Sequence, residues 1–127
     1  MQKFDFAYII DGLFHNERDN VIVIVDYKTS AKPPTNPLQL MLYAWASSIL
    51  YPDILKYPIR SAYHMLRTDT MVYHDISPEI IVQTDNYMAE QVALMEKCFR
   101  LGYFPTAAGG HCRFCPLHAC EDRQPGL

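Results

Sequence analysis

The sequence predicts an α/β fold in which a central mixed β-sheet of four or more strands is flanked by helices and followed by a cysteine-rich tail. Three observations support this prediction. Apolar strand-like runs occur in pairs joined by short polar turns, a helical pattern follows each pair, and the last segment lacks apolar periodicity. With 127 residues and half of them apolar, the chain fits one domain, with a core over residues 4–101 and a tail over residues 102–127.

The first pair of strands is predicted at Phe4–Phe14 and Val21–Tyr27, joined by the polar turn 15–20 as an antiparallel hairpin. Val21–Val25 is β-branched throughout and therefore apolar on both faces. This pattern is typical of a central strand that is covered by helices on each side. Three prolines in Ala31–Pro37 then end the second strand.

A helix is predicted over Leu38–Leu50, with Asn36 as a plausible cap. A second hairpin follows, with strands at Ile59–Arg67 and Met71–Ile76. The last helix is predicted over Glu79–Leu101. Ser77 is its expected N-cap, Pro78 occupies the first helical position, and Gly102 ends it.

The bulk properties exclude some classes of function. The apolar runs are too short to cross a bilayer and Met1 does not open a signal peptide, so no membrane role and a cytoplasmic location are expected. The net charge of −3 gives no overall attraction to nucleic acid. A polyanionic partner would therefore have to meet a local basic patch or a bound metal.

Two carboxylates occur at strand ends, together with a lysine. Asp11 follows an apolar strand pattern, and Asp26 ends the β-branched run two residues before Lys28. Because side chains alternate along a strand, Asp26 and Lys28 should face one site. Two anionic oxygens and one ammonium can hold a hard divalent cation and activate a water, although a surface ion pair explains a lone Asp-x-Lys equally well.

Gln39 and Tyr43, four residues apart on the predicted helix, should share one helix face. With Asp11 and the run Asp26-Tyr27-Lys28, this order of residues resembles the RecB-like branch of the PD-(D/E)xK nuclease superfamily, in which a Gln-x3-Tyr motif follows the catalytic strands. The resemblance extends from about residue 9 to residue 120. It implies a restriction-endonuclease-like core and a Mg²⁺- or Mn²⁺-dependent nuclease.

The resemblance also implies roles for these residues. Asp11 and Asp26 would be metal ligands, the main-chain carbonyl of Tyr27 could complete the shell, and Lys28 would orient or polarise the attacking water. Gln39 and Tyr43 would contact the DNA backbone or the catalytic lysine. The expected activity is that of a DNA exonuclease in recombination, repair or phage DNA processing, as in phage, bacterial and CRISPR-associated relatives.

Three cysteines form the spacing Cys112-x2-Cys115-x4-Cys120, which suits a tetrahedral metal or the corner of an iron–sulfur cluster. A fourth ligand could be Cys98, His111 or His118, and a buried apolar thiol is the commoner interpretation of Cys98. The segment resembles the C-terminal cluster region of iron–sulfur members of the RecB-like family. This implies a [4Fe-4S] cluster, with Zn²⁺ as the alternative.

The family usually has a helix before the first catalytic strand, and this chain starts at that strand. The helix is therefore expected to be absent, supplied by a partner, or part of a longer chain. One alternative function is a catalytically impaired DNA-binding or assembly subunit that a partner completes. Others are a metal-dependent hydrolase acting on RNA, and a zinc-stabilised interaction module.

Overall fold

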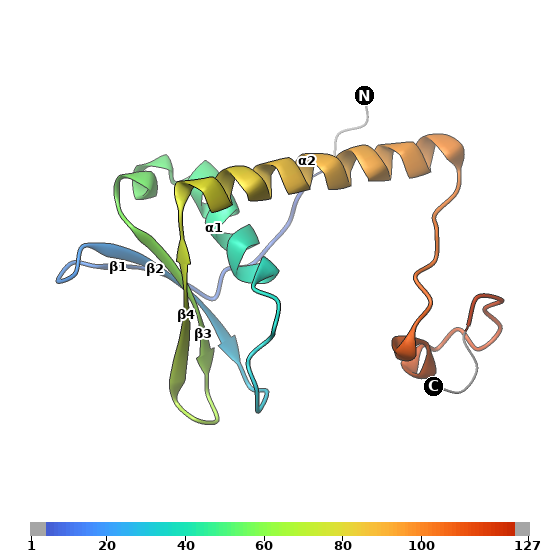
Figure 1. Ribbon diagram of the computed structural model, residues 1–127, viewed down its shortest axis with the longest axis horizontal. Helices are drawn as coiled ribbons and strands as arrows, with labels where there is room; N and C mark the ends of the chain where they lie inside the picture. Colours follow the sequence, from blue (N-terminus) through green and yellow to red (C-terminus); the bar gives the residue numbers. More distant parts are fainter. Residues whose placement is uncertain (1–4, 124–127) are drawn as a thin grey trace. The chain divides into compact units, whose positions relative to one another are not determined.

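The structure is a computed structural model that describes residues 5–123. Its elements follow one another in the order shown in Figure 1. They are β1 (Gly12–Asn16), β2 (Val21–Lys28), α1 (Leu38–Leu50), η1 (Pro52–Lys56), β3 (Ile59–Met65), β4 (Thr70–Ile76), α2 (Pro78–Leu101) and η2 (Gly110–Phe114). Contacts divide the chain into two compact units, residues 1–92 and 93–127. The single-domain organisation stays a prediction.

The four strands form one mixed sheet in the order β1-β2-β3-β4. The β1 and β2 strands are antiparallel, β2 and β3 are parallel, and β3 and β4 are antiparallel. The parallel pair requires a crossover connection, which α1 and η1 provide. The predicted α/β fold class, both hairpins and the inner position of β2 are therefore confirmed.

The core lies on the face of β2 that carries Ile22 and Ile24. These side chains are buried with Ala44 of α1, and Ile80 and Ile81 at the start of α2 pack against the same cluster. Within residues 5–92, both helices therefore contact this one face. The expectation of helices on each side of β2 is wrong for this unit, because β-branched residues favour a strand whether or not a helix covers both of its faces.

The opposite face of the sheet carries aromatic side chains that are about half exposed. Phe14 pairs with Val23 across β1 and β2, and Tyr73 pairs with Ala62 across β3 and β4. The exposed fractions are 51% for Phe14, 43% for Tyr27 and 49% for Tyr73. The two faces of this sheet therefore differ, and the carboxylate and ammonium of the predicted site lie on the helix-covered one.

The first strand begins later than expected. It was predicted from Phe4, which lies outside the described residues, whereas β1 starts at Gly12 and runs to Asn16. The carboxylate of Asp11 accepts a hydrogen bond from the backbone amide of Tyr27, at 3.0 Å. A side chain therefore takes the place of a main-chain partner at this point, and the β1–β2 ladder ends there.

The helix ends follow the sequence signals closely. Helix α1 spans Leu38–Leu50 as predicted, and Asn36 Oδ1 accepts a hydrogen bond from the Leu38 amide at 2.9 Å. At the start of α2, Ser77 Oγ accepts one from the Ile80 amide at 3.3 Å. Gly102 ends α2 with a φ of +63°, in the left-handed region that favours glycine. The short 3-10 helices η1 and η2 were not predicted.

None of the helices within residues 5–123 has the length and apolar character needed to cross a membrane.

Candidate active site

The end of β2 and the first half of α1 position the candidate site. Asp26 and Lys28 follow Ile22 and Ile24 at two-residue intervals, so all four side chains point to the face on which α1 packs. Lys28 Nζ lies 2.8 Å from Asp26 Oδ2. The strand period thus brings the carboxylate and the ammonium to one side of the sheet.

Asp26 is almost completely buried, with 4% of its surface exposed. Its Oδ2 forms the ion pair with Lys28, yet the contact is not aligned as a hydrogen bond, and within the described residues this oxygen has no hydrogen-bond partner. The pKa of Lys28 is raised, chiefly by the side-chain contact with Asp26, although burial acts in the opposite direction. Lys28 is therefore protonated at neutral pH.

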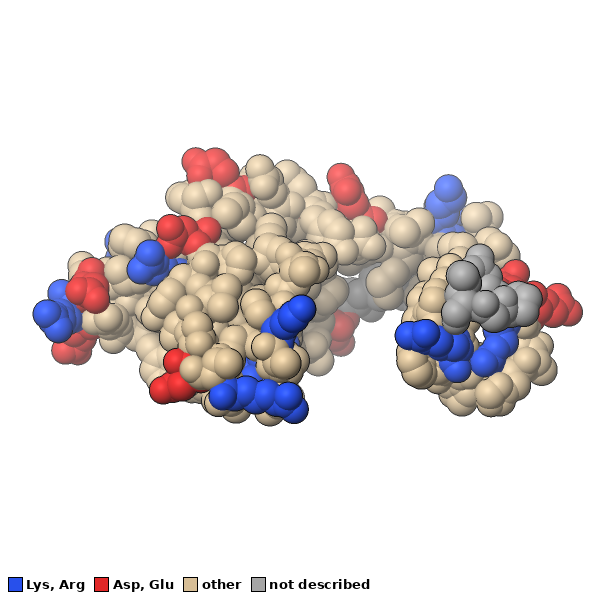
Figure 2. All heavy atoms as spheres, turned by 60° about the horizontal axis from the view of Figure 1, so that its bottom comes forward, with Lys and Arg blue, Asp and Glu red and all other residues tan. Residues whose placement is uncertain are grey.

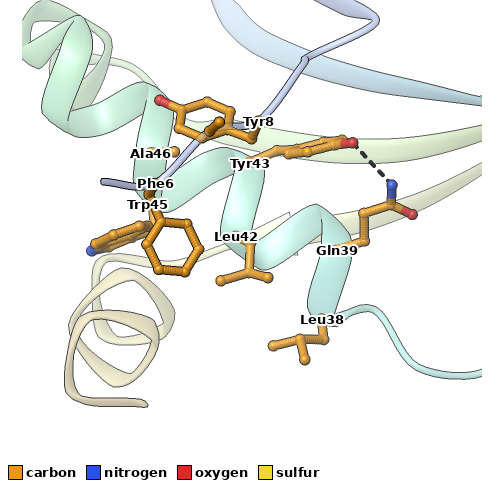
Figure 3. A pocket seen from close by; sticks show the side chains of 9 residues that line it. Phe6, Tyr8, Leu38, Gln39, Leu42, Tyr43, Trp45 and Ala46 are labelled. Atoms are coloured by element: carbon orange, nitrogen blue, oxygen red, sulfur yellow. Dashed lines mark hydrogen bonds between the residues drawn. The ribbon is translucent and has the colours of Figure 1, made fainter. Parts of the chain in front are cut away.

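Gln39 connects this ion pair to Tyr43. Lys28 Nζ donates a hydrogen bond to Gln39 Oε1 at 2.8 Å. Gln39 Nε2 donates one to the Tyr43 hydroxyl at 2.9 Å, drawn as a dashed line in Figure 3. The two α1 residues are one turn apart and face the sheet together. The four side chains Asp26, Lys28, Gln39 and Tyr43 form a continuous polar chain, which we call the site relay.

Asp11 contacts the backbone of Tyr27, the residue between Asp26 and Lys28 of the site relay. It is exposed, and its Oδ2 accepts the Tyr27 amide hydrogen. The Lys28 carbonyl accepts a hydrogen bond from Leu66, which follows β3. Since backbone groups alternate between the two edges of a strand, the Tyr27 carbonyl points to the other edge, towards Asp11. The structure thus brings Asp11 and the Tyr27 backbone together.

These groups fit a hard divalent cation. The buried Asp26 Oδ2 has the Lys28 ammonium beside it and no hydrogen-bond partner among the described residues, so a metal cation could also bind this oxygen. No group of three or more His, Cys, Asp or Glu side chains lies close enough to hold a metal anywhere in residues 5–123. Two carboxylates and one carbonyl are a small ligand set, which suits Mg²⁺ because this ion retains several waters. The metal roles of Asp11, Asp26 and Tyr27 stay predictions.

The cysteine segment belongs to the second unit. Cys112 lies in η2 and its Sγ accepts a hydrogen bond from the Gly109 amide at 3.4 Å, while Cys115 and Cys120 follow outside any helix or strand. All three are partly exposed. The part of the chain that the structure describes does not gather them into a metal-binding group. Their role as ligands of a cluster or of zinc stays a prediction.

Two features near the site were not identified from the sequence. Tyr63 is fully buried on the same face of the sheet, and Lys28 Nζ lies 5.5 Å from the centre of its ring. Burial is the main cause that raises the pKa of the Tyr63 phenol. The second feature is an aromatic pocket that begins at Gln39 and Tyr43 and extends to Trp45 and Phe6 (Figure 3). Only the fold of residues 5–10 against α1 reveals it.

Charged residues of both signs are interspersed on the face of the molecule seen in Figure 2, and much of that face is uncharged. This agrees with the small net charge of −3. On this face, no broad basic surface is available for a phosphate backbone. On this face, attraction of a polyanion would therefore depend on local charge.

The comparisons with known proteins agree with this geometry. A family model described as the PD-(D/E)XK nuclease superfamily matches residues 6–120, and this range includes Asp11 and the whole site relay. Searches of the curated proteins and of the solved structures found no match. The run Asp26-Tyr27-Lys28 has the residue pattern (D/E)XK that the family description names, and its role as the catalytic motif stays a prediction; the match covers most of the 127 residues. The chain belongs to the PD-(D/E)XK nuclease superfamily.

Proposed function

We propose that this protein is a metal-dependent deoxyribonuclease of the RecB-like branch, acting as an exonuclease on DNA. The observation that carries the proposal is the site relay, in which Lys28 contacts the buried Asp26 carboxylate on one side and Gln39 on the other. The Gln39-x3-Tyr43 spacing supports the RecB-like branch. Recombination, repair and phage DNA processing in the cytoplasm are the settings we propose for it.

In this proposal, different residues bind the metal ion and stabilise the charge on the phosphate. Asp11, Asp26 and the Tyr27 carbonyl would hold Mg²⁺ or Mn²⁺. Such an ion, when bound, polarises a phosphate oxygen and lowers the pKa of a bound water. The Lys28 ammonium lies beside Asp26 and acts as a fixed positive charge that stabilises negative charge developing on the phosphate.

Gln39 positions Lys28 by accepting one of its hydrogen bonds, which fixes the direction of the ammonium. The same amide donates to Tyr43, so the Tyr43 hydroxyl is used as an acceptor and its own proton remains to be donated. We assign that proton to a non-bridging oxygen of the DNA backbone. Gln39 and Tyr43 are thus positioning residues that link α1 to the phosphate.

The test is a cleavage assay on linear single-stranded and double-stranded DNA with Mg²⁺, Mn²⁺ or EDTA. Lys28→Ala and Asp26→Ala are compared with Lys56→Ala and Asp53→Ala. The control residues form an ion pair of the same chemistry on the surface, with side chains 71% and 87% exposed. RNA of the same sequence and circular DNA complete the substrate set.

We expect metal-dependent degradation by the wild type and by both control variants, and none by Lys28→Ala or Asp26→Ala. Products that shorten from the ends, with circular DNA intact, identify an exonuclease. Degradation of RNA alone would contradict DNA as the substrate. If the wild type binds DNA without cleaving it, the second candidate function is favoured, a nuclease-fold subunit completed by a partner or by a preceding helix. The exposed position of Asp11 is the observation that supports testing this candidate.

A further inference from the structure

A pocket of about 340 Å³ opens beside the site relay, between residues 6–8 and α1. Figure 3 shows the rings of Phe6, Tyr8, Tyr43 and Trp45 around it. Leu38, Leu42 and Ala46 complete its apolar lining, with the Gln39 amide at one end. Its size falls within the range of pockets that bind small flat ligands. The site relay shares Gln39 and Tyr43 with the pocket, so an occupant would lie next to the Gln39 amide that accepts the Lys28 hydrogen bond.

The lining indicates the chemistry of the occupant. Among residues 5–123, no charged side chain lines the pocket, so a phosphate would lose its hydration there without a compensating charge from these residues. A flat, uncharged heterocycle is better suited, because aromatic faces stack on it and the Gln39 amide and Tyr hydroxyls can meet its polar edge. Phe6 and Trp45 meet edge to face, with ring centres 6.3 Å apart and planes at 83°.

We infer that this pocket binds one unpaired nucleobase of the DNA strand whose phosphate lies at Lys28. The inference rests on the proposed function and adds a substrate class to it, namely single-stranded or frayed DNA. A base inside a duplex is stacked and paired, and it must be extruded before it can enter such a pocket. Any base can stack on aromatic rings, so the pocket should distinguish unpaired DNA from paired DNA without preferring a base sequence.

The wall of the pocket is open at Phe6, which is 54% exposed. Beside Phe6, Trp45 is fixed by a hydrogen bond from its Nε1 to Asp85 Oδ1 of α2, at 2.8 Å. Trp45 is the only tryptophan in the 127-residue sequence. Its fluorescence therefore reports on this pocket alone, without any need for catalysis.

The experiment is a titration of Trp45 fluorescence in EDTA with a single-stranded deoxythymidine oligonucleotide. An abasic strand with the same number of phosphates is the control ligand. The variants are Phe6→Ala, Phe6→Leu and Phe104→Ala. Phe104 is the matched control, because it is 55% exposed and also makes one edge-to-face contact, with Phe99 at 5.1 Å.

We expect the thymidine strand to quench Trp45 and the abasic strand to bind more weakly by about 5- to 150-fold, the range that one stacked base represents. Phe6→Ala should weaken binding of the thymidine strand within the same range, Phe6→Leu less, and Phe104→Ala not at all. Equal quenching by the abasic strand, or unchanged affinity in Phe6→Ala, would overturn the inference. Circular dichroism of each variant checks its fold.

The two proposals fail in different ways. Metal-dependent cleavage without any difference between thymidine and abasic strands leaves the nuclease assignment standing and removes the base pocket. Base-dependent quenching by a wild type that cleaves no DNA keeps the pocket and contradicts the nuclease activity. Lys28→Ala should lose cleavage and keep the difference between the two strands, since Lys28 does not line the pocket.

Discussion

Lys28 Nζ lies 2.8 Å from Asp26 Oδ2, and the two partners differ in burial: 5% of the Asp26 side chain is exposed against 25% for Lys28. The carboxylate therefore depends on the ammonium far more than the ammonium depends on the carboxylate. A buried ion that loses its partner is destabilising, whereas an ammonium near the surface can be solvated.

This asymmetry predicts the stability of variants at the pair. Lys28→Met should lower the free energy of unfolding by about 1–3 kcal/mol, because Asp26 is left buried and unpaired. Adding Asp26→Asn should recover most of the loss. Urea unfolding measures both effects, with Lys56→Met as a control that should change stability little. Equal stability of Lys28→Met and the wild type would contradict the prediction.

The raised pKa of Lys28 predicts how this contribution depends on pH. Asp26 stabilises the charged form, so the contribution is complete below the pKa of an unfolded lysine, about 10.4, and is lost as the pH rises through the higher folded pKa. The stability difference between the wild type and Lys28→Met should thus stay constant near neutral pH and shrink only at strongly alkaline pH. A decline near neutral pH would show that Lys28 titrates there.

The order of contacts in the site relay predicts graded losses of cleavage. Gln39→Ala removes a hydrogen bond to a charged group and should lower kcat by about 10- to 100-fold. Tyr43→Phe removes the neutral hydrogen bond with Gln39 and should lower kcat by about 2- to 10-fold. It also removes the hydrogen bond proposed to a DNA phosphate, which should raise KM. Gln83→Ala, on the exposed surface of α2, is the control. A larger effect of Tyr43→Phe than of Gln39→Ala would reverse the proposed order.

The position of the Phe14 ring is predicted to depend on the absence of a side chain at Gly12. A Cβ added at Gly12 would lie 2.4 Å from Phe14 Cε2, so the ring would have to move. Because Phe14 is half exposed, its ring can swing away, and Gly12→Ala should destabilise the protein by only about 1 kcal/mol. The same substitution in a Phe14→Ala background should cost less, as a double-mutant cycle of unfolding free energies will show. Equal costs in both backgrounds would disprove the coupling.

The cysteine segment is predicted to hold a metal or an iron–sulfur cluster. Protein purified without oxygen should carry iron and absorb visible light, or carry zinc and remain colourless. Cys112→Ser, Cys115→Ser and Cys120→Ser should each lower the metal content. Cys98→Ser should not, because Cys98 is buried within α2, with 9% of its surface exposed. Unchanged metal content in the first three variants would exclude these thiols as ligands.

Local patterns predicted much of the fold correctly, because each depends on a few neighbouring residues. Asn36 and Ser77 mark the starts of α1 and α2, and Gly102 marks the end of α2. The sequence missed the late start of β1 for a non-local reason. Asp11 hydrogen bonds to the Tyr27 amide, a residue 16 positions away, and this contact ends the ladder.

The sequence by itself determined which side chains share a face of their own element. A period of two placed Asp26 beside Lys28, and a period of 3.6 placed Gln39 beside Tyr43. Only the tertiary structure decided that these two faces meet, that both helices pack on one face of the sheet, and that residues 6–8 form a pocket against α1. The reason is physical: periodicity fixes a side chain's direction relative to its own backbone, whereas contacts between elements depend on how the whole core packs.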